Sequence, residues 1–179
     1  MMSTGSPDAL NLEYSKDNKA TWQVVPTAKC TIPCGTTFYV RTKSTEPVAT
    51  IGNKDAKNYW AFYLKRITEN DTVIISGNVM SLLDQTCQST TLKEDYVFAY
   101  LFAGYTITAT KGGIKIGDLK LPATTLSKGC YQGMFKGQKV NGGALPALPA
   151  TTLAEDCYRE MFRSCNYLKI AIPANYLPA

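Results

Sequence analysis

The side chains best suited to chemistry lie near the C-terminal end of this 179-residue chain, where Glu155, Asp156 and Glu160 are interspersed with Arg159 and Arg163. Carboxylates can act as general acids or bases, but the chain has no histidine, which is both the commonest general base and the commonest metal ligand. Acidic and arginine residues at this spacing are typical of a salt-bridged, solvated surface. We therefore predict no catalytic residue and no cofactor, and a protein that is not an enzyme.

Six cysteines could form disulfides, bind a metal or fill a core. Cys30 and Cys34 flank a short strand and turn, so a bridge or a close contact between them is open. Cys130, Cys157 and Cys165 fall among apolar residues, where cysteine behaves as a small hydrophobe, and we expect free thiols there. A zinc site needs four convergent ligands, and the first half of the sequence offers one close cysteine pair. We predict no metal site.

These residues belong to an internal repeat. The letters L-P-A-T-T-L occur at residues 121–126 and again at 148–153, an offset of 27 residues. The pattern C-Y-x-x-M-F follows each copy at the same offset, beginning at Cys130 and at Cys157. A third copy begins at residues 172–177, and a diverged copy runs from Thr90 to Phe102. Periods in the twenties predict a solenoid whose repeats each pair a short strand with a helical turn.

Each repeat is expected to place its apolar side chains on one helical face. In the second copy the apolar positions between 157 and 165 have the spacing of such a face, and charged residues take the other side. Thr152 with Glu155, and Thr91 with Glu94, have the form of capping boxes, while the proline and threonines of L-P-A-T-T-L favour a short strand. The side chains expected in the core of the repeats are Leu126, Cys130, Tyr131, Met134, Phe135, Leu153, Cys157, Tyr158, Met161, Phe162 and Cys165.

The repeat closely resembles the BspA-like leucine-rich repeats of surface proteins from gut and oral bacteria and of phages that infect them. In that family L-P-A-T-T-L precedes C-Y-x-x-M-F and a second cysteine, which is Cys165 here and is replaced by Gln138 in the first copy. A segment similar to residues 77–83, G-N-V-M-S-L-L, leads from a β-domain into the first repeat of such proteins. The resemblance therefore extends from about Leu12 to the end of the chain.

The first part of the chain has the pattern of an antiparallel β-domain. Short β-rich runs separated by turn-forming clusters predict an immunoglobulin-like β-sandwich, with residues 59–64 as a central strand because both of its faces are apolar. Residues 15–22 resemble an Asp-box hairpin, in which Asp17 bonds the turn and Lys19 replaces the usual glycine. A single copy of this motif predicts a structural hairpin and not descent from a glycosidase.

The sequence thus predicts an α+β protein in three parts: a tail at 1–9, a β-sandwich at 10–83, and a short leucine-rich-repeat solenoid at 84–179 with a hairpin insertion near 104–116. The tail is small and polar, lacks the features of a secretion signal, and would be ordered only against a partner such as a neighbouring subunit. No apolar stretch approaches the roughly 20 residues of a membrane span. The net charge of +5 is scattered, which disfavours nucleic acid as a partner.

Recognition or assembly is the function that fits this composition. Stacked repeats present rows of exposed side chains that could contact protein loops or glycans, and the uncapped C-terminal repeat could bind a neighbouring subunit. Two settings are open: a phage virion component, such as a capsid-associated, decoration or fibre protein, or a bacterial cell-surface or secreted adhesin. The residues expected to bind are Tyr105, Lys128, Gln132, Lys136, Glu155, Arg159 and Arg163.

Overall fold

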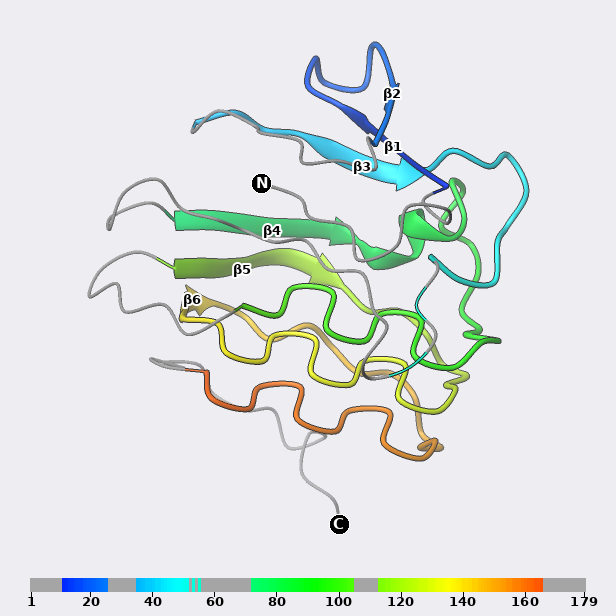
Figure 1. Cartoon of the computed structure of the whole chain (residues 1–179), viewed down its shortest axis with the longest axis vertical. Coiled ribbons are helices and arrows are strands. Elements are labelled where there is room, and N and C mark those ends of the chain that lie inside the picture. The colour runs from blue at the N-terminus through cyan, green and yellow to red at the C-terminus, as the bar shows by residue number, and fades with distance from the viewer. Residues whose placement is uncertain are drawn as a thin grey trace.

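The computed structural model describes residues 11–25, 35–51, 53, 55, 72–104 and 113–165. In this part of the chain two three-stranded sheets lie one above the other, and undulating segments accompany the lower sheet (Figure 1). The elements in chain order are β1 (Leu12–Ser15), β2 (Gln23–Val24), β3 (Tyr39–Thr42), β4 (Thr72–Asn78), the 3-10 helix η1 (Val79–Leu82), β5 (Gly113–Lys120) and β6 (Val140–Gly143).

The upper sheet is antiparallel, in the order β2-β1-β3. Side chains alternate along β1, so Leu12 and Tyr14 are buried on one face while Glu13 lies on the other. Glu13 is paired with Arg41 of β3 at 2.6 Å, and the Arg41 guanidinium lies 3.9 Å from the Trp22 ring centroid. The predicted sandwich stays a prediction, because its expected central strand at residues 59–64 lies outside the described residues.

One carboxylate ties the turn between β1 and β2. Asp17 Oδ1 accepts hydrogen bonds from the Ser15 hydroxyl at 2.7 Å and from the Thr21 N–H at 2.9 Å, and the Thr21 hydroxyl donates to Asp17 Oδ2. These bonds, led by that of the Thr21 hydroxyl, lower the pKa of Asp17 to about 2. Lys19, at the glycine position of the Asp-box pattern, has a φ of 73°. The left-handed turn therefore forms without glycine, and the Asp17 hydrogen bonds offset its conformational cost.

The lower sheet is parallel, in the order β4-β5-β6. Thr72 pairs with Gly113 at the start of β4, and Ile114 pairs with Val140 of β6. Parallel neighbours need a long crossover, and here each crossover passes through a corner and a run of turns. Residues 72–78, which the sequence assigns to the N-terminal domain, thus share a sheet with the repeat-containing part. Residues 113–116, expected at the end of the hairpin insertion, begin β5.

Runs of turns occupy the positions where the sequence predicts helices. They cover residues 95–102, 128–137 and 155–164, and are called the first, second and third runs. At every fourth residue φ is positive, and within the described residues these positions are Tyr96, Tyr100, Gly129, Gly133, Gly137, Asp156, Glu160 and Ser164. A left-handed residue interrupts α-helical hydrogen bonding and leaves bonds of the i to i+3 type, such as Gln132 N–H to the Gly129 carbonyl at 2.9 Å. The helix predicted at 157–165 and both capping boxes are wrong for this reason, although the apolar side chains of 157–165 do pack inward and Arg159 and Arg163 are exposed, as predicted.

Backbone hydrogen bonds between the runs share one direction. Phe98 N–H of the first run donates to the Cys130 carbonyl of the second at 2.9 Å, and Tyr131 N–H of the second donates to the Cys157 carbonyl of the third at 2.9 Å. Alternate residues repeat this pattern along the first and second runs, while the N–H groups between them, and those of alternate residues in the third run, bond within their own run. Each run therefore offers carbonyl acceptors to the run before it and N–H donors to the run after it.

Aromatic rings stack in two columns across the runs. In one column the centroids of Phe98, Tyr131 and Tyr158 are 5.8 and 5.7 Å apart. In the other, Phe102, Phe135 and Phe162 are separated by 5.6 and 5.3 Å. These rings pack against a single hydrophobic cluster that also contains Leu12 and Ile51. One core therefore joins the upper sheet to the runs of turns.

The residues expected in the core of the repeats differ in how far they are buried. Six of its members are buried, namely Cys130, Tyr131, Met134, Phe135, Cys157 and Met161, and four are partly buried, namely Leu126, Tyr158, Phe162 and Cys165. Leu153 is 63% exposed, so its placement in the core is wrong. It belongs to the last layer described, whereas its equivalent Leu126 has a further layer packed after it. The strand expected within L-P-A-T-T-L is also displaced, because β5 ends at Lys120 and residues 121–126 form a corner with one bridge, Thr125 to Thr91.

Candidate interaction surface

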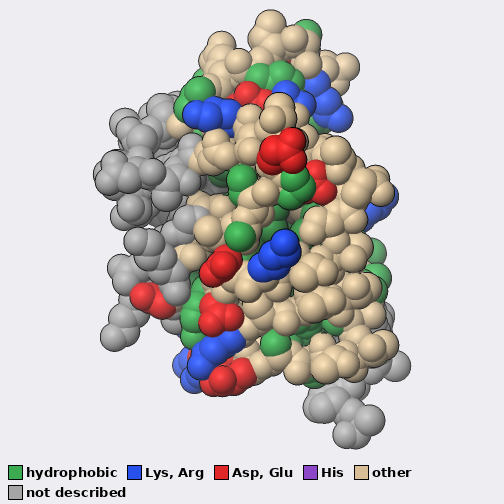
Figure 2. All heavy atoms as spheres, turned by 90° about the vertical axis from the view of Figure 1, so that its right-hand side faces the viewer, with side chains coloured by type: hydrophobic (Ala, Val, Ile, Leu, Met, Phe, Trp, Pro, Cys, Tyr) green, Lys and Arg blue, Asp and Glu red, His purple; other side chains and the backbone are tan. Residues whose placement is uncertain are grey.

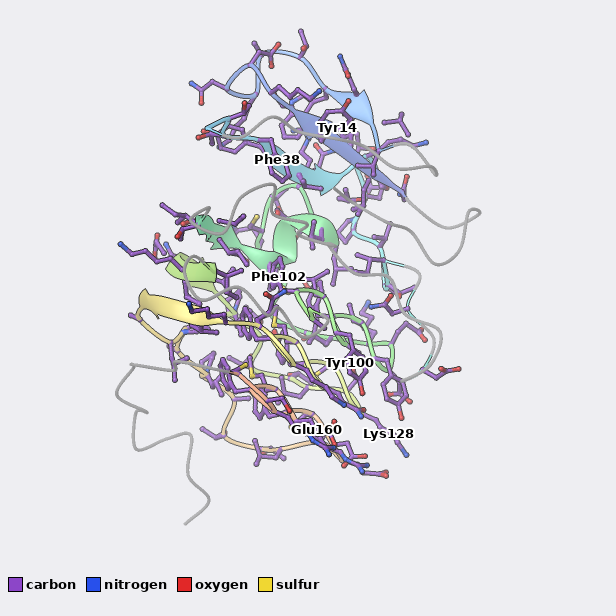
Figure 3. The ribbon with its side chains drawn as sticks, turned by 60° about the vertical axis from the view of Figure 1, so that its left-hand side comes forward. Tyr14, Phe38, Tyr100, Phe102, Lys128 and Glu160 are labelled. Atoms are coloured by element: carbon purple, nitrogen blue, oxygen red, sulfur yellow. The ribbon has the colours of Figure 1, made fainter. Side chains whose placement is uncertain are left out.

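Charged side chains link the second and third runs on their outward side. Lys128 Nζ lies 2.8 Å from Glu155 Oε1, and Lys136 Nζ lies 2.6 Å from Glu160 Oε2. Acidic and basic side chains lie next to one another on the lower part of the face in Figure 2, and Figure 3 labels Lys128 and Glu160 on the lower runs. The sequence offset of 27 residues sets the first pair, since it aligns position 128 with 155, whereas Lys136 reaches Glu160, which lies 24 residues further along the chain.

Two further ion pairs lie within the third run. Arg159 Nη1 is 3.1 Å from Asp156 Oδ2, and Arg163 is paired with Glu160. Contact with Lys136 and then with Arg163 lowers the pKa of Glu160, and contact with Asp156 raises the pKa of Arg159. Each shift favours the charged form, so these groups stay ionised near neutral pH. The surface is suited to electrostatic recognition and not to proton transfer.

Gln132 is buried, which corrects its prediction as an exposed binding residue. The Gln132 Nε2 lies 3.4 Å from the hydroxyl of Tyr100. Lys136 Nζ lies 5.7 Å from the centroid of the same tyrosine ring. The ring of Tyr100 lies against Gly133, where an added Cβ would be only 2.4 Å from Tyr100 Cε1. The tyrosine can fold down over the next run because that run has glycine at this position.

The last run leaves donors on its outer side. Gly129, Gly133 and Gly137 donate their N–H groups to the third run at 2.8 to 2.9 Å. At the equivalent positions of the third run, the N–H groups of Asp156, Glu160 and Ser164 meet no acceptor among the described residues. The exposed side chains of Glu155, Arg159 and Arg163 accompany this row. We call these six residues together the outer edge.

The opposite end of the stack is closed by a residue that sequence reasoning missed. Asn53 is buried, and its Nδ2 donates to the carbonyls of Val97 and Ala99 at 3.1 and 3.2 Å. In the second run the equivalent carbonyls, those of Cys130 and Gln132, accept from the run before. At these two carbonyls Asn53 thus supplies the donors that a preceding run would supply. Nothing in the local sequence marks it, whereas the four-residue spacing of Gly129, Gly133 and Gly137 is a readable signal for the turns.

The thiols of the repeats are free and are positioned for packing. Burial raises the pKa of Cys130 to about 12 and that of Cys165 to about 11, and it also raises the pKa of Cys157. They are poor nucleophiles at neutral pH. In the described part of the chain no cluster of three His, Cys, Asp or Glu side chains could hold a metal ion. Tyr105, Cys30 and Cys34 lie outside that part, as do the tail at 1–9 and the third repeat copy at 172–177.

Comparison with known proteins gives no match: no family model, curated protein or solved structure is similar to this chain. None of the described residues forms a helix with the length and apolarity that a bilayer span requires.

Proposed function

We propose that this chain is a non-enzymatic structural or recognition protein that presents stacked runs of turns to other macromolecules. The observation that carries the proposal is the outer edge. Three of its N–H groups have no acceptor among the described residues, whereas the equivalent N–H groups of the second run donate to the third run. Unpaired backbone donors at the edge of an ordered ladder are the usual template for docking another polypeptide.

The setting we propose is a virion, in which the chain serves as a capsid-associated, decoration or fibre protein of a phage. The open outer edge supports this setting, and the organisation as a β-domain and a short leucine-rich-repeat solenoid is part of the same proposal. In this role, another polypeptide of the virion would bind at the outer edge, and neighbouring subunits would bind through residues 1–9.

The alternative is a bacterial surface or secreted adhesin. The resemblance of its repeats to the BspA-like repeats of bacterial surface proteins favours it, together with the exposed side chains of Arg159 and Arg163. Guanidinium groups can donate hydrogen bonds to the hydroxyl groups of a glycan.

Solution mass distinguishes the two settings. Light scattering of the full chain, and of a chain without residues 1–9, should give a defined oligomer that dissociates when the tail is removed. A monomer at all concentrations would contradict the assembly role. In that case binding of the chain to a panel of host-surface glycans, compared with an Arg159→Glu/Arg163→Glu variant, tests the adhesin alternative.

A further inference from the structure

The direction of the backbone hydrogen bonds limits what can bind the outer edge. Every backbone–backbone hydrogen bond that links the described runs passes from an N–H of one run to a carbonyl of the next. The carbonyls of Asp156 and Glu160 already accept within the third run, from Arg159 at 3.0 Å and from Arg163 at 2.9 Å. The edge is therefore a row of donors, and its occupant has to supply a row of acceptors.

A second copy of this chain does not meet that requirement through the same surface. Two outer edges placed face to face would set donors against donors, and both would carry arginines. A head-to-tail contact would need the acceptor end of the first run, where Asn53 already bonds the Val97 and Ala99 carbonyls. Self-association through this edge is thus disfavoured at both ends of the stack.

The side chains beside the donors define the charges of the occupant. Along the column that contains Glu155, charge alternates from Asp95 to Lys128 to Glu155, with Lys128 N–H bonded to Asp95 at 3.1 Å and Lys128 Nζ paired with Glu155 at 2.8 Å. The next position in that column calls for a cation. The column of Lys136 and Arg163 already holds two cations, and its next position calls for an acid.

Resting on the proposed function, we propose that the outer edge binds a partner polypeptide that folds as a further run of turns with a four-residue period. The partner offers carbonyls to the N–H groups of Asp156, Glu160 and Ser164, a Lys or Arg opposite Glu155, and an Asp or Glu opposite Arg163.

The test uses a synthetic peptide with the sequence of the second run of this chain, residues 127–139 with Lys136→Glu, in reducing buffer. Added to the isotopically labelled full chain in the millimolar range, it should shift the amide signals of Asp156, Glu160 and Ser164 and slow their hydrogen exchange. The control peptide has the same sequence with Lys128→Glu and with Lys136 retained, so that both charges are exchanged. It should bind at least about fivefold more weakly, because two attractive contacts become repulsive.

Three results would overturn the proposal. The first is that the amides of Asp156, Glu160 and Ser164 are as protected in the free chain as those of Gly129, Gly133 and Gly137. The second is that neither peptide affects them, and the third is that both peptides bind equally. Light scattering distinguishes failure of this proposal from failure of the proposed function. If the chain forms an oligomer but the amides of Asp156, Glu160 and Ser164 do not respond to either peptide, only the proposal about the partner polypeptide is wrong.

Discussion

Burial differs sharply between leucine and methionine side chains only eight positions apart. Met161 is 4% exposed and Leu153 is 63% exposed, although the repeat pattern predicts both in the core. Replacing Met161 with Ala should lower the free energy of unfolding by about 2–4 kcal/mol, because it removes buried methylene groups and leaves a cavity. Leu153→Ala is the matched control and should change it by less than about 0.5 kcal/mol in urea denaturation. Equal losses at both sites would contradict this difference in burial.

Both the backbone conformation at position 133 and the contact with Tyr100 require glycine there. Its φ is 58°, and a Cβ there would lie 2.4 Å from Tyr100 Cε1. Gly133→Ala should cost about 2–4 kcal/mol, from left-handed strain and from displacement of the Tyr100 ring. Gly35 has a φ of 78° and nothing within 4 Å of an added Cβ, so substitution there measures the backbone strain without a steric clash. Gly35→Ala should cost about 1–2 kcal/mol, and thermal unfolding of both variants measures the difference.

At the scale of elements, each part of the fold is held by polar groups placed at its ends. Asp84 follows η1, and its carboxylate accepts from Thr86 N–H at 2.9 Å and from Ser89 N–H at 3.0 Å, which lowers its pKa, with the Thr86 hydroxyl as the largest cause. Asn53 plays the corresponding part at the first run, and Asp17 at the β1–β2 hairpin. These are elements too short or too irregular to be stable through backbone hydrogen bonds alone.

The first run should depend on Asn53. Asn53→Ala leaves the buried carbonyls of Val97 and Ala99 without this donor and should lower the free energy of unfolding by about 2 kcal/mol. Asn53→Asp should cost more, because a carboxylate would then face two carbonyl oxygens. Urea denaturation measures both, and the amides of the first run should lose exchange protection before those of the second. A neutral Asn53→Ala change would show that the run is closed by other groups.

The β1–β2 hairpin should weaken in acid. The folded pKa of Asp17 is about 2, below its ordinary value of 3.8, so the carboxylate stabilises the hairpin above pH 3.8 and this contribution is lost as the pH falls toward 2. The amide shift of Thr21, which donates to Asp17, should titrate with a midpoint near the lower value. In Asp17→Asn this titration should vanish. A midpoint close to 3.8 would mean that the hydrogen bonds of the turn do not form in solution.

At the scale of the whole molecule, the two parts expected from the sequence share contacts that oppose independent unfolding. Val48 N–H donates to the Leu83 carbonyl at 2.8 Å, and the Gln85 side chain donates to the Thr42 carbonyl at 3.0 Å. A single hydrophobic cluster likewise contains both Leu12 of β1 and Met161 of the third run. These contacts thus join the N-terminal part to η1 and to the segment that follows it, which leads into the first run.

Unfolding should therefore be cooperative. Urea denaturation followed by near-ultraviolet circular dichroism, which reports the aromatic columns, and by amide signals of β1 and β3 should give coincident transitions. Two separated midpoints would contradict this and would instead support independent folding of residues 10–83 and 84–179.

The sequence by itself determined which residues are equivalent. Its 27-residue offset aligned Tyr131 with Tyr158 and Lys128 with Glu155, and these residues are neighbours in the structure. Only the tertiary structure decided the conformation of the runs. Positions 157, 158, 161 and 162 fit a period of 3.6 or of 4 equally well over so short a span, and the choice depends on left-handed residues whose cost is met by hydrogen bonds to the neighbouring run. The exposure of Leu153 and the role of Asn53 were likewise beyond sequence reasoning, because both depend on which layers lie next to one another.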